Sequence, residues 1–243
     1  KFQAHYRFGN FSDLSRFLRN LPQKNSVIVI YDKNIAHIYR DFWDLSLSGV
    51  AQLEIDAEEA NKNLESLEII LSFLAENEAR RNTVLVAIGG GVLTDMAAFA
   101  ASIFKRGIRC ILIPTSLIGQ IDAAIGGKTA INLKHGKNLV GSFFLPETVF
   151  ICPNFLETLP YNHFVSGYLE MVKIALITDA KWFSNFPDNI DSQFILQHIE
   201  KSIKEKLHII KDDWTGRHFR KILNFGHTIG HALESAFAPR SEE

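Results

Sequence analysis

The chain has 243 residues, of which 47% are hydrophobic and 22% are charged, and 26 Lys and Arg nearly balance 27 Asp and Glu. This composition is typical of a globular protein that can bury a sizeable core. The formal net charge of -1 gives no indication of a nucleic-acid-binding surface, and no polybasic run indicates binding to an anionic membrane. No apolar stretch is long enough to span a bilayer.

Both cysteines, Cys110 and Cys152, lie in apolar runs that are typical of buried strands. They form neither a disulfide framework nor a CxxC metal site, which fits a reducing compartment. The first residues, 1–5, lack the apolar segment of a signal peptide. We therefore expect a cytoplasmic protein.

Short β-branched runs alternate with helical patterns over the first 150 residues. The predicted strands span residues 26–31, 83–88, 109–113 and 148–152, and the predicted helices among them span residues 61–77 and 96–104. Strands that alternate with helices in this way predict an α/β fold, with a parallel sheet covered by helices on both faces.

The second half of the chain has a different pattern. Residues 120–144 are rich in Gly, Lys and Asn and have little periodicity, so we expect a long functional loop there. Beyond Pro160 helical patterns dominate, most clearly over residues 164–177 and 195–210. We place a domain boundary near Pro153, between an α/β domain (1–153) and a mostly helical domain (154–243).

Three glycines, Gly89 to Gly91, follow the second predicted strand and precede a helix. Glycines at such a junction let backbone N–H groups approach a pyrophosphate at a helix N-terminus. The spacing differs from the common GxGxxG dinucleotide fingerprint. A tight turn without a ligand is therefore an equally good interpretation of these three residues alone.

Two Gly-Lys turns lie close together in the predicted loop: Gly126-Gly127-Lys128-Thr129 and Gly136-Lys137-Asn138. Each places an ammonium group beside accessible backbone donors, an arrangement that suits a phosphorylated anion. The first turn lacks the leading glycine of the Walker spacing. Two solvated surface lysines are the alternative interpretation.

Two histidines near the end of the chain, His227 and His231, are four residues apart and would share one face of a helix. This spacing suits a metal ligand beside a second ligand or a catalytic imidazole, although a catalytic zinc site still needs a third protein ligand. Two helix-capping histidines in a packed interior are the alternative.

A carboxylate and an ammonium group, Glu170 and Lys173, are three residues apart on an apolar helical segment. Such a pair either satisfies itself or forms part of a site. We favour a site, because burying an ion pair that has no function is costly.

Taken in order, these motifs resemble the 3-dehydroquinate synthases from about Asp32 to Glu234. The matching segments are Gly89-Gly90-Gly91-Val92 with Asp95, Lys105-Arg106-Gly107-Ile108, Pro114-Thr115-Ser116-Leu117, Gln120-Ile121-Asp122, Gly126-Gly127-Lys128-Thr129, Gly136-Lys137-Asn138, Gly167 with Glu170 and Lys173, and Leu223-Asn224-Phe225-Gly226-His227-Thr228.

The resemblance implies a nucleotide-binding α/β domain followed by a mostly helical metal-binding domain. It also implies a reaction, the conversion of 3-deoxy-arabino-heptulosonate 7-phosphate into 3-dehydroquinate and phosphate in the shikimate pathway of aromatic amino acid biosynthesis. In that family bound NAD transiently oxidises a ring hydroxyl, phosphate leaves by elimination, the hydride returns, and an aldol step closes the carbocycle. The expected partner is a small sugar-acid phosphate.

The resemblance also implies roles for individual residues. Glu170 and His227 would bind Zn²⁺ or Co²⁺, which would polarise the hydroxyl that is oxidised. Substrate or catalytic positions match Asp122, Lys128, Lys137, Asn138, Lys173, Lys206, Arg220, Asn224 and His231. Arg106 matches a phosphate contact that the family supplies from a neighbouring subunit, which implies a homodimer. NAD positions match Asp32, Glu59, Lys62, Gly90, Gly91, Val92, Leu93, Thr94, Asp95, Thr115, Ser116, Lys128, Lys137, Phe155 and Thr158.

The sequence departs from the family pattern at several positions. Glu58 replaces a usual Gly, Ser116 replaces a usual Thr, and Trp214 and Gly216 stand at usually acidic positions. The family continues beyond the position of Glu234 to a Leu-His-Gly-Glu segment that carries the third zinc ligand. Because residues 235–243 contain no such segment, we expect a truncated chain that binds zinc weakly.

Three other functions remain open. Another sugar phosphate cyclase would make a different carbocycle from a related substrate. A glycerol-dehydrogenase-like oxidoreductase would share the fold and the metal but release NADH. A nucleotide-binding fragment without activity would lack a complete metal site.

Overall fold

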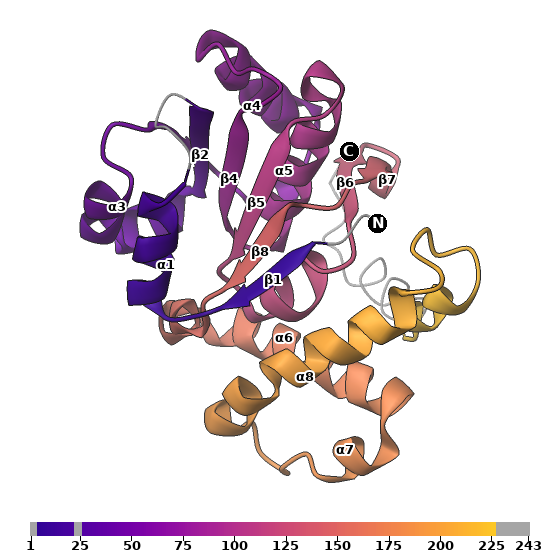
Figure 1. The fold of residues 1–243 in the computed structure, drawn as a ribbon. Coiled ribbons are helices and arrows are strands. Elements are labelled where there is room, and N and C mark those ends of the chain that lie inside the picture. Colours follow the sequence, from indigo (N-terminus) through magenta and orange to yellow (C-terminus); the bar gives the residue numbers. More distant parts are fainter. Residues whose placement is uncertain (1–3, 22–25, 227–243) are drawn as a thin grey trace, which may run out of the picture.

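The structure is a computed structural model that describes residues 4–21 and 26–226. Its centre is a six-stranded, all-parallel sheet with the strand order β1-β8-β5-β4-β2-β3 (Figure 1). The strands are β1 (His5–Phe8), β2 (Val27–Asp32), β3 (Ala51–Ile55), β4 (Val84–Gly89), β5 (Arg109–Pro114) and β8 (Thr148–Ile151). The chain leaves β2 toward one edge of the sheet and leaves β4 toward the other. The carboxyl ends of these two neighbouring strands therefore flank a topological switch point, where α/β folds bind ligands.

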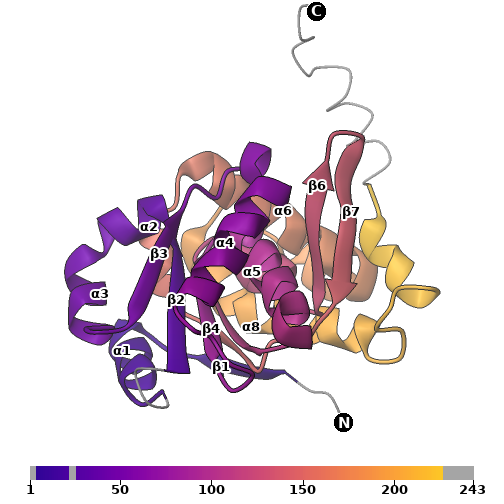
Figure 2. The same cartoon turned by 90° about the horizontal axis from the view of Figure 1, so that it is seen from above.

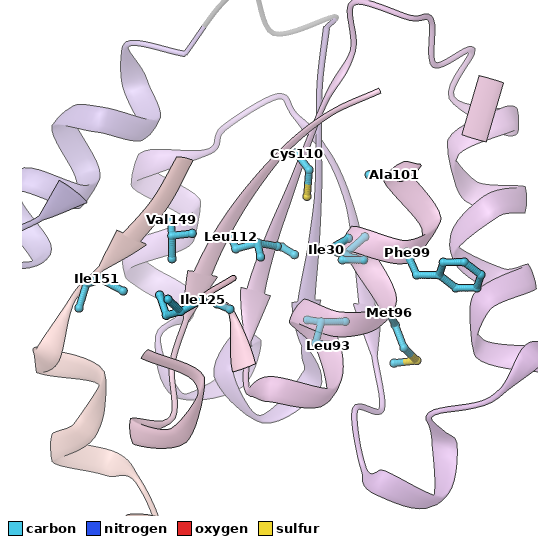
Figure 3. Close-up of a cluster of buried hydrophobic side chains, with 14 of the residues drawn as sticks. Ile30, Leu93, Met96, Phe99, Ala101, Cys110, Leu112, Ile125, Val149 and Ile151 are labelled. Atoms are coloured by element: carbon cyan, nitrogen blue, oxygen red, sulfur yellow. The ribbon is translucent and has the colours of Figure 1, made fainter. Parts of the chain in front are cut away.

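Helices cover both faces of the sheet (Figure 2). One face packs on α1 (Phe11–Arg19), α2 (Lys33–Ile38) and α3 (Arg40–Ser46), and the other on α4 (Leu64–Glu76) and α5 (Gly91–Ile103). Alternate residues of β2 face opposite sides of the sheet. Val29 is buried in the hydrophobic cluster with α1 to α3, and Ile28 and Ile30 are buried in the cluster with α4 and α5. Figure 3 shows Ile30 on the sheet beside Leu93 of α5. Continuous β-branched runs are typical of strands buried on both faces.

After β8 the described part of the chain is helical. It contains η5 (Pro153–Thr158), α6 (Tyr161–Thr178), α7 (Ala180–Ser184), α8 (Ser192–Ile210) and η6 (Phe219–Asn224). Met171 of α6 and Ile203 of α8 are buried in the same hydrophobic cluster as α5. The helical region thus packs directly onto the α/β region. The expected fold class is confirmed, and the division at Pro153 stays a prediction.

The prediction of a long loop over residues 120–144 is wrong. A π-helical turn, η4 (Gly119–Ala123), is followed by an antiparallel hairpin of β6 (Lys128–Leu133) and β7 (Gly136–Phe143). Thr129 and Ile131 point into the protein between less buried neighbours, an alternation too short to stand out among Gly, Lys and Asn. Close strand approach also depends on Gly141, where a Cβ would lie 1.9 Å from the carbonyl oxygen of Thr129.

Other predicted elements begin and end within a few residues of those observed. The helix expected from residue 61 begins at Leu64, because the Asn63 side chain accepts a hydrogen bond from the N–H of Ser66 and caps α4. The sequence analysis missed β1, β3 and α1 to α3.

Within the described residues, no helix combines the length and apolarity needed to cross a membrane.

Candidate active site

A cavity of about 590 Å³ opens where the hairpin, the π-helical turn and the helical region meet. The residues expected from the sequence that line it are Asp95, Asp122, Lys128, Asn138, Lys173, Lys206, Arg220 and Asn224. They come from α5, η4, β6, β7, α6, α8 and η6. The fold therefore gathers eight predicted site residues, scattered over 130 positions of the sequence, around one space.

The carboxyl edge of the sheet lies beside this cavity and carries several residues expected at the cofactor. Asp32 ends β2 and caps α2 through the N–H of Asn34 at 2.8 Å. Thr115, just after β5, donates its N–H to the carbonyl oxygen of Gly89 at 3.0 Å. The neighbouring Ser116 hydroxyl accepts from the N–H of Gly119 at 3.2 Å. These contacts hold the ends of β2, β4 and β5 on both sides of the switch point.

The glycine turn after β4 leaves the first turn of α5 open. Gly90 is the N-cap residue of α5, and no side chain caps this end of the helix. A Cβ on Gly89 would lie 2.7 Å from Leu93, and one on Gly91 would lie 3.0 Å from Ala123. Close packing thus requires small residues here, and the uncapped N–H groups at the positive end of the helix dipole suit a pyrophosphate.

A buried ion pair joins the cofactor side to the cavity. The Lys62 ammonium lies 2.7 Å from the Asp95 carboxylate and also donates to Asn138 Oδ1 at 2.7 Å. Lys62 is only 4% exposed. Burial raises the pKa of Asp95 to about 6, although the Lys62 ammonium opposes this shift. The three side chains thus link the segment before α4 to α5 and β7 through charge-assisted contacts.

A second buried lysine holds the π-helical turn. Lys206 of α8 donates to Asp122 Oδ1 at 2.5 Å and to the main-chain oxygen of Asp122 at 2.6 Å. Lys206 is 5% exposed, so its ammonium group is largely removed from water, whereas the Asp122 side chain is 31% exposed. Its two hydrogen bonds fix both the main chain and the carboxylate of Asp122, and a π-helical turn of this kind is frequent at functional sites.

The Glu170–Lys173 pair lies on α6, as the spacing predicts. Lys173 Nζ lies 2.7 Å from Glu170 Oε1 and donates to the carbonyl oxygen of Leu223 at 2.8 Å. Lys173 is thus the ion-pair partner of this buried oxygen, and no other described residue donates a hydrogen bond to it. Burial, and then the Asp122 carboxylate, raises the pKa of Glu170. A buried carboxylate oxygen with unused acceptor capacity fits a metal ligand.

Two cations of the cavity, Lys128 and Arg220, form no salt bridge with another described residue. Burial, then the charges of Arg220 and Lys206, lower the pKa of Lys128. Burial also lowers the pKa of Arg220, whose guanidinium donates to the carbonyl oxygen of Trp214. A lysine whose pKa is lowered by burial and by neighbouring positive charges favours a bound anion, which would restore the charge balance.

Some expected site residues lie away from the cavity. Phe155 is fully buried in the core, with its ring 5.0 Å from that of Phe11. The Thr158 hydroxyl lies 2.8 Å from the hydroxyl of Tyr39. Arg106 follows α5 with a positive φ of 67°. Their proposed contacts with cofactor or a neighbouring subunit stay predictions, as do those of Lys137 and Glu59.

The metal site is only partly within the described residues. His227 and His231 lie outside them, and among residues 4–21 and 26–226 no group of three or more His, Cys, Asp or Glu side chains is arranged to hold a metal ion. Of the expected ligands, the structure therefore describes Glu170. The role of His227 and His231 stays a prediction.

The sequence analysis missed the apolar and small residues through which the hairpin closes the cavity. These are Thr129, Ala130, Leu139, Gly141, Ser142 and Phe143, with Ile125 and Leu223 from outside the hairpin. Phe143 contacts Trp214 with ring centroids 5.7 Å apart. The β-branched residues Thr129 and Ile131, two positions apart, are the one signal in the sequence that indicates a strand here.

Comparison with known proteins identifies relatives of this chain. The chain is 40% identical over 222 residues to the 3-dehydroquinate synthase of Clostridium tetani, an alignment that covers 88% of this chain and 60% of the relative. The chain thus spans less than two thirds of the length of that protein.

Two solved structures share the fold closely. The 2-epi-5-epi-valiolone synthase of Streptomyces hygroscopicus, solved with NAD⁺ and Zn²⁺, matches with a TM-score of 0.84 at 28% identity, over 99% of this chain and 70% of that one. A 2-deoxy-scyllo-inosose synthase, solved with carbaglucose-6-phosphate, NAD⁺ and Co²⁺, matches with a TM-score of 0.80 at 27% identity, over 96% of this chain and 66% of that one.

Family models agree with these relatives along most of the sequence. The model of the 3-dehydroquinate synthase N-terminal region matches residues 52–166, and the model of the C-terminal region matches residues 167–241. The two matches are contiguous and cover the hairpin, the glycine turn and the helical region. The chain therefore belongs to the 3-dehydroquinate synthase family.

Proposed function

We propose that this protein eliminates phosphate from 3-deoxy-arabino-heptulosonate 7-phosphate and closes the product ring to 3-dehydroquinate. One observation carries the proposal: the cavity contains four cations, Lys128, Lys173, Lys206 and Arg220, against two carboxylates, Asp95 and Asp122, among its described lining residues. An excess of two positive charges suits a substrate that carries both a carboxylate and a phosphate.

Within this proposal the four cations have two different roles. Lys206 and Lys173 have carboxylate partners, Asp122 and Glu170, and would orient groups at the reacting centre. Lys128 and Arg220 have no such partner among the described residues and would bind the charged ends of the substrate. The planar guanidinium of Arg220 can contact two oxygens of a phosphate or carboxylate at once.

The residues at the carboxyl edge fit NAD. The uncapped N-terminus of α5 after Gly90 suits the pyrophosphate. Asp32 lies at the switch point, where an acidic residue can accept hydrogen bonds from ribose hydroxyls. Asp95, beside Lys62, lies between this edge and the cavity. Bound NAD⁺ would supply a reversible oxidation of a substrate alcohol, and this chain would hold cofactor and substrate in contact.

Glu170 fits a divalent metal, because its carboxylate is largely buried and Lys173 is its one ion-pair partner among the described residues, which leaves acceptor capacity for a metal ion. We propose that it binds Zn²⁺, or Co²⁺, together with His227. A metal there would supply Lewis acidity to the alcohol that is oxidised. Lys173, which is 2.7 Å from Glu170, would then be displaced toward the substrate or remain as an ion-pair partner.

The closest competing function is that of another sugar phosphate cyclase. By their names, both proteins whose solved structures are described above are synthases of that wider group, and this chain is 27–28% identical to them. The 40% identity to a 3-dehydroquinate synthase favours the heptulosonate phosphate. A homodimer, with Arg106 contributing to the partner's site, and a cytoplasmic location are further parts of the proposal.

A substrate panel tests the proposal. The protein is supplied with NAD⁺ and with an excess of Zn²⁺, because weak zinc binding is expected. It is offered the heptulosonate phosphate, glucose 6-phosphate and sedoheptulose 7-phosphate, while released phosphate and NADH absorbance are recorded. We expect phosphate release from the first compound alone, without NADH accumulation. Phosphate release from either of the others would indicate a different cyclase, and stoichiometric NADH from an alcohol would indicate a dehydrogenase.

A further inference from the structure

The β6–β7 hairpin is irregular next to the cavity. Its ladder pairs Ile131 with Val140 and then Leu133 with Gly136. Between these pairs, Asn132 alone faces residues 137–139 of β7. Such irregularities occur beside active sites, where they turn side chains away from the regular strand direction. Here the irregular stretch carries Lys137 and Asn138, two residues expected at the substrate.

Asn132 bonds outside the ladder. Its N–H donates to the carbonyl oxygen of Lys62 at 2.7 Å instead of to β7. Its side-chain amide donates to Glu59 Oε1 at 2.7 Å. Its Oδ1 accepts from the N–H of Asn138 at 2.8 Å. One residue thus contacts the segment before α4 on one side and the irregular part of β7 on the other.

The contact with Asn138 supports an unusual backbone conformation. Asn138 has a φ of 56°, in the left-handed region, which Asn tolerates better than most residues but does not prefer. In this conformation its side chain accepts from Lys62 Nζ at 2.7 Å. Without the Asn132 oxygen, the N–H of Asn138 would lose its partner and the left-handed turn would lose support.

We propose that Asn132 is a positioning residue that couples the cofactor side of the site to its substrate side. Its amide group holds the carboxylate of Glu59, which the family resemblance assigns to the cofactor, and its oxygen holds Asn138, and with it the Lys62 contact, at the cavity. The proposal rests on the proposed function for the identity of cofactor and substrate. No part of it requires Asn132 to touch either one.

Two variants separate the two halves of this role. Asn132→Ala removes both the donor and the acceptor. Asn132→Asp keeps an oxygen for the Asn138 N–H but replaces the donor with a second carboxylate beside Glu59. The control is Asn10→Ala, which removes the cap of α1, far from the hairpin in sequence, and reports the effect of a purely structural loss.

Three quantities are measured on each protein: NAD⁺ affinity by calorimetry, exchange of the Asn138 amide hydrogen by NMR, and kcat at saturating NAD⁺ with phosphate release as readout. For Asn132→Ala we expect NAD⁺ affinity to fall about tenfold. We also expect the Asn138 amide to exchange about tenfold faster and kcat to fall about tenfold. Each change corresponds to the loss of one hydrogen bond to a charged or constrained group. For Asn132→Asp we expect the same loss of NAD⁺ affinity, but near-wild-type exchange and kcat.

The inference is overturned if Asn132→Ala matches Asn10→Ala in affinity and exchange, or if the Asp and Ala variants are indistinguishable in exchange. Wild-type protein that binds NAD⁺ but releases no phosphate would refute the proposed function, and the affinity and exchange results would still decide the role of Asn132. Wild-type protein that does not bind NAD⁺ would overturn both.

Discussion

Two walls of the cavity hold charged side chains by different means. The helical wall, formed by α6, α8 and η6, carries Glu170, Lys173, Lys206 and Arg220. Helix periodicity fixes their directions, and packing against the core fixes the helices. The hairpin wall, formed by β6 and β7, carries Lys128 and Asn138. There, a left-handed residue, an irregular ladder and polar contacts from Lys62 and Asn132 set the geometry.

This difference indicates which changes each wall tolerates. The helical wall depends on close packing, so added volume should disturb it most. The hairpin wall depends on individual hydrogen bonds and charges, so removing a polar group should disturb it most.

The largest effect is expected for Gly167→Ala in α6. A Cβ at Gly167 would lie 2.5 Å from Leu117 Cβ and 2.8 Å from the main-chain nitrogen of Ile118, so the helix must shift. Alanine normally favours a helix by about 1 kcal/mol over glycine, but overpacking of this kind costs about 3 kcal/mol. We expect a net loss of stability in urea denaturation and loss of phosphate release. The exposed neighbour Ser166→Ala should change neither, and a stabilised Gly167→Ala would show that the packing is loose.

On the hairpin wall, Lys128→Ala should abolish turnover and leave the fold intact. A substrate phosphate beside Lys128 would lose a charge-assisted contact of about 1.5–3 kcal/mol, together with its placement. Phosphate release and circular dichroism are the measurements. Lys134→Ala at the exposed tip of the same hairpin is the matched control, and wild-type turnover by Lys128→Ala would remove this residue from the site.

A smaller, pH-dependent effect is expected at Asp95, which joins the two sides of the site. Because its pKa is raised to about 6 in the folded protein, the folded state retains a proton that the unfolded state has lost. Stability contributed by this group therefore falls as pH rises from about 4 to 6.

Comparison with Asp95→Asn isolates this contribution. Relative to the variant, the wild type should lose about 2 kcal/mol of unfolding free energy between pH 4 and pH 7. Urea denaturation of both proteins across this range is the measurement. A constant difference between them would mean that Lys62 keeps the Asp95 carboxylate ionised throughout.

The smallest effect is expected at the ring contact between the walls, Trp214 on Phe143. Trp214 Nε1 is buried and has no hydrogen-bond partner among the described residues. Trp214→Phe should therefore change stability by less than about 1 kcal/mol, since it retains the ring and removes an unsatisfied donor. Thermal unfolding measures this, and a large loss would reveal an unrecognised partner for the indole N–H.

The same contrast explains what the sequence could predict. Glu170 and Lys173 share a helix, so their spacing alone indicates a common face, and the structure places them 2.7 Å apart. The three central strands were predictable because burial on both faces leaves continuous β-branched runs. Family motifs indicated the eight expected residues that line the cavity.

The hairpin wall was not predictable in this way. Its strands carry Gly, Lys and Asn, and only Thr129 and Ile131 alternate into the core. The edge strand β1 is largely exposed and has no apolar pattern. The role of Asn132 depends on contacts with Glu59 and Lys62, which lie 73 and 70 positions away in the sequence. Contacts of that kind arise from tertiary structure, and local periodicity contains no information about them.

The central claim is that the two walls hold a phosphate-bearing substrate against a cofactor that is not consumed. The most direct test follows phosphate release and absorbance of NADH together, with protein, NAD⁺, Zn²⁺ and the heptulosonate phosphate in one reaction. We expect many equivalents of phosphate per protein with no net NADH. Accumulation of NADH in step with phosphate, or NADH formation without phosphate, would contradict it.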